Sequence, residues 1–243
     1  RRLRDSGVRE VQVLGNLKFD MTPAPALLAA GHAWRAALQR PVVMFAASRE
    51  GEEASLLDAW VRTLAPSSPA QAARRPLLLI VPRHPPRFDE VAALVAARGL
   101  VLARRSTWGG AATPPPEACL ADVWLGDSLG EMPIYYAAAD LALLGGSFAP
   151  LGGQNLIEAA ACGCPLLMGP HTFNFAQAAE LALAAGAAER VPGMGEAVAR
   201  ALAWVSDAAA LAERAGRATS FAASHRGAAA RMAAAVLARI PAH

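Results

Sequence analysis

Short, nearly continuous runs of apolar residues alternate with longer helix-like segments through most of this sequence. Such runs are typical of strands that are covered on both faces, because a strand of this kind has no solvent-facing side. The segments between them suit the crossover helices that parallel strands require. The alternation therefore predicts an α/β fold with a doubly wound parallel sheet of the Rossmann-like type.

Strands are expected at residues 11–14, 42–47, 77–81, 100–103, 122–125, 140–144 and 165–168. Helices are expected at 24–39, 52–64, 89–97, 155–161 and 173–184, and prolines predict loops at 66–69 and 113–116. The alternation ends near residue 191, and the tail at 207–240 is predicted to form two helices broken near 224–227. Trp34, Trp60 and Trp204 are expected in the core, and His32 and His225 at the surface.

Composition and charge exclude several classes of protein. Of the 243 residues 54% are hydrophobic and 18% charged, so the chain can fold around an ample core. A net charge of +3 with scattered arginines does not predict a nucleic-acid partner. No apolar run is long enough to predict a membrane-spanning helix. The sequence begins with Arg1 rather than methionine, so we expect a soluble fragment of a longer protein.

The cysteines are Cys119, Cys162 and Cys164. An odd, sparse count does not predict a disulfide framework. The pair at 162 and 164 has no second Cys/His pair at zinc-site spacing. We therefore expect small buried thiols, no metal site and no cofactor.

Glycines and polar residues concentrate directly after the predicted strands, at 48–53, 82–85, 126–131, 145–147 with 152–158, and 169–172. The carboxyl ends of parallel strands meet at one edge, where open α/β sheets bind ligands. The chain lacks a G-x-x-x-x-G-K-[ST] loop, and no G-x-G-x-x-G follows its first predicted strand. We therefore expect a nucleotide site at this edge, but neither an NTPase nor a dehydrogenase.

Gly152 and Gly153 precede a predicted helix whose free N–H groups suit a phosphate or carboxylate, although such glycines also form ordinary turns. Asn155 and Glu158 lie three residues apart and share one face of that helix. The Glu158 carboxylate can accept hydrogen bonds from two ribose hydroxyls, or it can merely complement the helix dipole. Arg83 can bind an anion bidentately or form a surface ion pair. Open alternatives also include helix capping by Ser48, dipole stabilisation by Glu50, Glu52 and Glu53, a structural His171, and a turn role for Asp127.

Seven short stretches follow one another in the order GNLKFD (15–20), SREGEE (48–53), VPRHP (81–85), GDSLGE (126–131), GGSF (145–148), GGQNLIE (152–158) and MGPHT (168–172). Together, from about residue 8 to about residue 190, they resemble the Kdo (3-deoxy-D-manno-octulosonic acid) transferases. These are glycosyltransferases of the GT-B type, built from two Rossmann-like domains. The resemblance is to their C-terminal half.

The resemblance implies a CMP-Kdo donor and an inverting transfer to a lipid A precursor at the cytoplasmic face of the inner membrane. It implies nucleotide contacts at Pro82, Arg83, Leu129, Gly130, Glu131, Asn155, Leu156, Ile157 and Glu158. Candidates for contacts to the donor sugar or phosphate are Ser48, Arg49, Glu50, Gly146, Ser147, Gly152, Gly153, Gln154 and His171. Residues 1–225 would form the donor-binding domain, and 226–243 a helix that returns to an N-terminal domain outside this chain.

The chain differs from the family's pattern at Gln154, where the family usually has a histidine. Glutamine donates a hydrogen bond but carries no charge, so a charge-dependent role does not transfer to this position. The family's general base is a glutamate of the N-terminal domain, which also supplies the acceptor pocket and any membrane contact. We therefore expect no catalytic residue in this chain, which should bind the donor without transferring Kdo.

Two other interpretations of the site remain open. One is another enzyme built from two Rossmann-like domains, such as a UDP-sugar epimerase, which would prefer UDP to CMP. The other is a non-catalytic nucleotide-binding module that regulates a partner. In that case, restoring the N-terminal half would bring back no activity.

Overall fold

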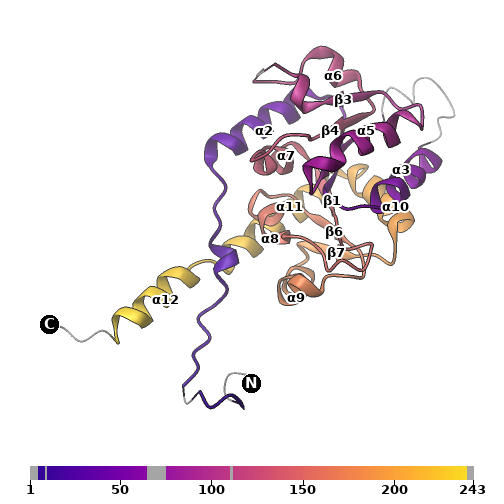
Figure 1. Cartoon of the computed structure of the whole chain (residues 1–243). Coiled ribbons are helices and arrows are strands. Elements are labelled where there is room, and N and C mark those ends of the chain that lie inside the picture. Colours follow the sequence, from indigo (N-terminus) through magenta and orange to yellow (C-terminus); the bar gives the residue numbers. More distant parts are fainter. Residues whose placement is uncertain (1–4, 9, 65–74, 110–111, 240–243) are drawn as a thin grey trace.

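A fully parallel seven-stranded sheet forms the centre of the molecule (Figure 1). The structure is a computed structural model and describes residues 5–8, 10–64, 75–109 and 112–239. The strand order is β3-β4-β2-β1-β5-β6-β7, so the winding reverses between β1 and β5. The strands are β1 (Val42–Ser48), β2 (Leu77–Pro82), β3 (Leu102–Arg104), β4 (Val123–Leu125), β5 (Leu141–Leu144), β6 (Leu166–Met168) and β7 (Ala188–Arg190). The predicted doubly wound α/β fold is confirmed.

Helices cover both faces of this sheet. One face packs against α2 (Pro25–Ala37), α7 (Met132–Ala138), α8 (Leu156–Ala161), α9 (Ala176–Ala184) and α11 (Ala208–Ser224), and the other against α3 (Glu52–Thr63), α5 (Phe88–Ala96) and α10 (Met194–Val205). The remaining helices are α6 (Pro116–Leu120), α12 (Ala228–Leu237) and the 3-10 turns η1 (Leu17–Asp20), η2 (Pro85–Arg87), η3 (Arg105–Thr107) and η4 (Phe173–Phe175). Successive strand residues point to opposite faces, so Met44 joins one core and Phe45 the other.

The two cores bury the three tryptophans as predicted. Trp34 contacts Trp108 edge-on, with 4.9 Å between ring centroids, while Trp60 and Trp204 lie in the opposite core. Helix α2 approaches α7 closely because Gly31 has no side chain. A Cβ at Gly31 would lie 2.3 Å from the carbonyl oxygen of Ile134.

Most predicted elements are confirmed, and the exceptions have physical reasons. Residues 11–14 are not a strand: Val13 is 91% exposed and the segment pairs with no strand. Its β-branched residues favour an extended backbone, but they form a strand only where a neighbouring strand is available for pairing. Strand β7 was not predicted, since its three residues Ala-Glu-Arg carry no β-branched or aromatic side chain. The predicted loop at 66–69 lies outside the described residues, and α6 begins at Pro116.

The first and last described segments meet beside the sheet. Asp20, at the end of η1, accepts hydrogen bonds from the backbone N–H groups of Gly227 (2.5 Å), Ala228 (3.2 Å) and Ala229 (2.5 Å). Its carboxylate thus caps α12, which extends away from the sheet together with the N-terminal segment (Figure 1). His32 is exposed as predicted, whereas His225 is only partly at the surface because its ring stacks on Phe19, with 4.9 Å between ring centroids.

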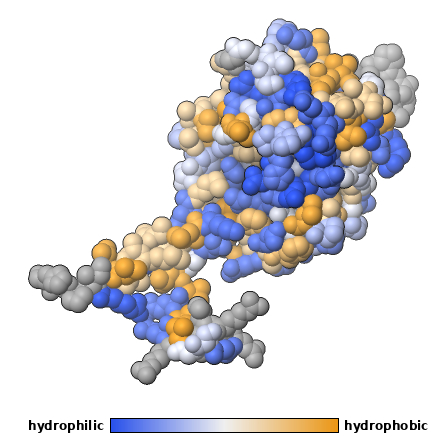
Figure 2. Space-filling model, in the orientation of Figure 1, coloured by the Kyte–Doolittle hydropathy of each residue, from blue (hydrophilic) through white to orange (hydrophobic). Residues whose placement is uncertain are grey.

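The apolar side chains of α12 remain largely uncovered. Val236 is 61% and Leu237 66% exposed, and the projecting helix shows hydrophobic colour in Figure 2. Their spacing in the sequence places both on one side of the helix with Met232 and residue 240, the last of which lies outside the described residues. The tail is confirmed as two helices, α11 and α12, with the break at residues 225–227.

Candidate functional site

A cavity of about 360 Å³ opens at the carboxyl edge of the sheet, where the winding reverses. Its walls are Ala47, Val81, Pro82, Arg83, Phe88, Ser128, Leu129, Gly130, Met132, Tyr136, Gln154, Asn155, Glu158 and Phe175. The loops after β1, β2 and β4 and the start of α8 therefore converge on one space. Open α/β sheets bind ligands at such a reversal point.

Arg83 follows β2 and lies in the wall of this cavity. Its backbone N–H donates to the carbonyl of Ser48 over 3.0 Å, which ties the ends of β2 and β1 together. The side chain is exposed and forms no ion pair with the described residues, so the surface ion pair considered above is not observed there. A guanidinium with no ion-pair partner at a cavity wall is suited to bind an anion.

Glu158 faces the same cavity from α8. Asn155 caps that helix by accepting a hydrogen bond from the N–H of Ile157 over 3.2 Å. Burial raises the pKa of Glu158, and the charge of Arg83 opposes that rise. Among the described residues no hydrogen-bond donor contacts the Glu158 carboxylate. A half-buried carboxylate in this state is prepared to accept hydrogen bonds from a ligand.

Leu156 and Ile157 lie between these two residues in the sequence, but their side chains are fully buried in the core. Their side chains cannot touch a ligand in the cavity. They instead fix the helix from which Asn155 and Glu158 project, so a contact to a nucleotide at these two positions would have to come from the backbone.

The loop after β4 is held by two acidic residues. Glu131 accepts two hydrogen bonds from Arg105, at 3.0 and 2.8 Å, and one from Ser128 at 2.5 Å. Asp127 accepts bonds from Arg104 and Ser106; these outweigh the effect of burial and lower its pKa. Asp127 thus has a network role that the sequence left open.

Of the three predicted nucleotide contacts in this loop, two line the cavity and one belongs to the network behind it. Leu129 is 78% exposed, and both Leu129 and Gly130 line the cavity. The Glu131 carboxylate is committed to Arg105 and Ser128 and does not line it. The structure therefore gives Glu131 a supporting position behind the loop.

The two serines among the donor candidates point into the protein. Ser48 is fully buried and donates to Glu53 over 3.0 Å. Ser147 is also fully buried; it donates to the carbonyl of Leu144 and accepts from the N–H of Gly169. Ser48 does not cap α3 either, because Gly51 occupies that position. A bulge at Ala46/Ser48 accompanies the inward direction of Ser48. A contact from either serine to a donor would therefore have to come from the backbone.

The other donor candidates are divided between the cavity and its surroundings. Gln154 lines the cavity, and Gly153 donates its N–H to the carbonyl of Gly146 over 2.8 Å. Half-buried Arg49 lies beside Gly146, and half-buried His171 donates its backbone N–H to Ser147. Arg49, Glu50, Gly146, Gly152, Gly153 and His171 are not part of the wall.

Sequence reasoning did not single out the aromatic residues that complete the wall, or the lysine that lies behind one of them. Tyr136, Phe88 and Phe175 line the cavity, and the ammonium of Lys18 lies 4.2 Å from the centre of the Phe175 ring. Lys18 belongs to η1, far from the strand ends in the sequence, so the strand-end rule could not find it. Its place in the GNLKFD stretch was the available signal.

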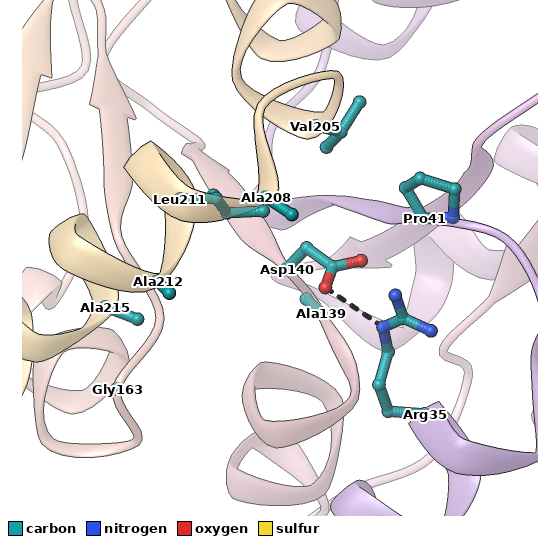
Figure 3. A pocket seen from close by; sticks show the side chains of 10 residues that line it. All are labelled: Arg35, Pro41, Ala139, Asp140, Gly163, Val205, Ala208, Leu211, Ala212 and Ala215. Atoms are coloured by element: carbon teal, nitrogen blue, oxygen red, sulfur yellow. Dashed lines mark hydrogen bonds and ion pairs between the residues drawn. The ribbon is translucent and has the colours of Figure 1, made fainter.

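A second cavity of about 400 Å³ lies at the opposite, amino edge of the sheet (Figure 3). Its charged residues neutralise each other: Asp140 accepts from Arg35 over 3.0 Å and from the N–H of Val42 over 2.7 Å. The rest of the wall is mostly alanine and aliphatic side chains, as Figure 3 shows. The cavity with Arg83 and Glu158 is therefore the better candidate site.

The described residues contain no cluster of His, Cys, Asp and Glu that could hold a metal ion. Within the same part of the chain, no helix combines the length and apolar character that a membrane crossing requires. Cys164 is buried and Cys162 half-buried, and both are free thiols.

Solved structures share this fold. A crystal structure described as the C-terminal CMP-Kdo binding domain of WaaA from Acinetobacter baumannii has a TM-score of 0.70 and 26% identity, covering 82% of this chain and 98% of that one. The C-terminal domain of the group 1 glycosyl transferase LpcC from Francisella tularensis has a TM-score of 0.54 at 12% identity, covering 85% and 96%. The fold is thus that of the C-terminal domain of a GT-B glycosyltransferase.

Sequence similarity narrows this class. The 3-deoxy-D-manno-octulosonic acid transferase of Bordetella pertussis is 49% identical over 227 residues, which cover 93% of this chain and 51% of that protein. The chain belongs to the Kdo transferase family and corresponds to its C-terminal domain. The chain spans about half the length of this relative. It covers 36% of the Kdo transferase of Haemophilus influenzae. No family model matches the chain.

Proposed function

We propose that this chain is the donor-binding domain of an inverting glycosyltransferase that moves Kdo from CMP-Kdo to a lipid A precursor. The observation that carries the proposal is the convergence of Arg83, Leu129, Gln154 and Glu158 on one cavity at the reversal point of the sheet. The likeness to a domain described as binding CMP-Kdo supports the choice of donor.

In the proposed complex, Glu158 accepts hydrogen bonds from the ribose hydroxyls, and Leu129 and Gly130 border the nucleoside. Arg83 balances the charge of the phosphate, which grows as CMP departs, and no metal is required for that step. Fixed cationic groups stabilise a leaving phosphate effectively because they need no rearrangement during the reaction. Gln154 and Arg49 then lie on the side of the Kdo moiety.

The general base and the acceptor site are proposed to lie in an N-terminal domain of the longer protein. Residues 1–225 would form the donor domain, and 226–243 would return to the N-terminal domain. The exposed apolar residues Val236 and Leu237 of α12 support this, because such a surface is stable when another surface covers it. The longer protein would act at the cytoplasmic face of the inner membrane, where it meets the lipid A precursor.

Isothermal titration of the chain with CMP, UMP and CMP-Kdo tests the proposal. We expect CMP and CMP-Kdo to bind at one site and UMP to bind more weakly. Preference for uridine nucleotides would favour a UDP-sugar enzyme instead. A complex structure with CMP on any other face of the sheet would overturn the site.

A further inference from the structure

Glu52 is a charged residue at the start of α3, yet only 3% of its surface is exposed. Its carboxylate accepts four backbone hydrogen bonds. One oxygen receives the N–H groups of Arg49 (3.1 Å) and Gly146 (2.8 Å). The other receives those of Phe148 (3.1 Å) and Ala149 (3.0 Å). These four bonds use the acceptor capacity of an ionised carboxylate and explain how its charge can be buried.

This arrangement differs from the ordinary role of an acid at a helix start. Such a residue complements the N–H groups of its own helix. Three of the four donors to Glu52 instead belong to the loop after β5, 94 to 97 positions further along the chain. Successive backbone N–H groups of this kind form a concave anion-binding site. Here the anion is part of the protein, so these amides are not available to the phosphate or carboxylate of a ligand.

The bonds of Glu52 fix loops that reach the cavity. The carbonyl of Gly146 accepts the N–H of Gly153, whose neighbour Gln154 lies in the cavity wall. On the other side, the Glu52 carboxylate holds the backbone N–H of Arg49. Gly146 has a φ of +69°, and a Cβ there would lie 3.1 Å from the Gln154 side-chain nitrogen. A larger residue at position 146 would therefore displace the Gln154 side chain.

The nucleotide side of the cavity depends on other contacts. Leu129 and Gly130 are positioned through Glu131 and Arg105, and Glu158 projects from a helix capped by Asn155. Neither group hydrogen-bonds to Glu52. Loss of the Glu52 bonds should therefore affect one end of the cavity and leave the other end in place.

We infer that Glu52 is a positioning residue for the sugar end of the donor site. Its carboxylate fills the backbone anion site after β5 and thereby sets Gln154 and Arg49 relative to the bound donor. The inference rests on the proposed function, and it assigns recognition of the acidic sugar to these side chains rather than to the backbone amides of Gly146, Phe148 and Ala149.

The Glu52→Gln variant tests this role, because it keeps the size of the side chain but turns one acceptor atom into an NH2 donor facing backbone N–H groups. Affinities of the chain for CMP and for CMP-Kdo are measured by titration calorimetry. We expect the affinity for CMP-Kdo to fall by about tenfold or more, as for the loss of a charge-assisted hydrogen bond. We expect the affinity for CMP to change by less than about twofold, because its contacts are held independently.

Asp58→Asn, on the exposed side of the same helix, serves as the matched control. Circular dichroism establishes that each variant is folded at the temperature of the titration; if Glu52→Gln does not fold, Glu52→Asp is used in the same comparison. Equal loss of CMP and CMP-Kdo binding in a folded variant would overturn the positioning role, as would wild-type affinity for both. Failure of the wild-type chain to bind either ligand would instead reject the proposed function.

Discussion

Replacing Glu158 by glutamine should weaken CMP binding without lowering the stability of the fold. In the free chain the carboxylate borders the cavity and receives no hydrogen bond from the described residues. Burial raises its pKa above the ordinary value for glutamate, so the fold disfavours the charged form. The charge is then a cost in the free protein and a benefit only when ribose hydroxyls occupy the cavity.

The size of the effect follows from the contact that is lost. Glutamine keeps one neutral acceptor oxygen, so Glu158→Gln removes roughly one charge-assisted hydrogen bond, worth about 1.5–3 kcal/mol. This corresponds to CMP binding that is weaker by about 10- to 150-fold. The melting temperature should stay the same or rise slightly, because the variant no longer buries a carboxylate.

The raised pKa of Glu158 predicts how stability and CMP binding change with pH. A carboxyl group with a raised pKa in the folded state binds its proton more tightly there than in the unfolded chain. Its ionisation therefore destabilises the free protein as pH rises from the unfolded pKa through the folded pKa. CMP binding should weaken as pH falls through the folded pKa, because the proton removes the charged acceptor. The Glu158→Gln variant should lack this pH dependence.

Titration calorimetry measures the affinity for CMP between about pH 4.5 and 7.5, a range that runs upward from the ordinary pKa of glutamate. Differential scanning fluorimetry measures the thermal stability. Glu117→Gln on α6 is the matched control, since Glu117 is exposed and lies outside the cavity wall. Unchanged CMP affinity in Glu158→Gln would show that Glu158 only complements the helix dipole. A large drop in melting temperature would show that the residue is structural.

Three further outcomes are expected. The purified chain should show no Kdo transfer to a lipid A precursor in a radiolabel assay, because the proposed base lies elsewhere; any transfer by the chain alone would refute this. Gly31→Ala should destabilise the fold by about 1–3 kcal/mol in urea titrations, because its Cβ would meet the Ile134 carbonyl at 2.3 Å; wild-type stability would show that α2 and α7 move apart freely. Hydrogen exchange should be slower for α12 in the longer protein than in this chain, and equal strong protection in both would show that the helix needs no second domain.

The sheet could be predicted because its strands carry a local signal. Strands β1, β2 and β5 are continuous apolar runs that are buried on both faces, and the sequence locates them within about a residue. Segment 11–14 has a similar apolar content but no neighbouring strand, and nothing local reveals that. Strand β7 has the reverse problem, since pairing with β6 and not composition makes it a strand.

The sequence predicted which loops form the site. The strand-end rule brought Arg83, Gln154 and Glu158 to one edge, because strand order fixes where loops lie. It could not determine the direction of a side chain. The strand bulge turns Ser48 inward, and Glu131 contacts Arg105, which lies on a turn outside the predicted edge. These details depend on tertiary contacts.

The cap that Asp20 forms on α12 also sets an order of events during synthesis. The carboxylate and its first N–H donor are 207 residues apart in the chain. At about 5–20 residues per second, a ribosome adds Gly227 roughly 10 to 40 seconds after Asp20. The paired strands are much closer in sequence, and they all precede α12. The sheet can therefore assemble on the ribosome before the Asp20 carboxylate meets its N–H donors. The cap on α12 can therefore form only after the strands of the sheet have been synthesised.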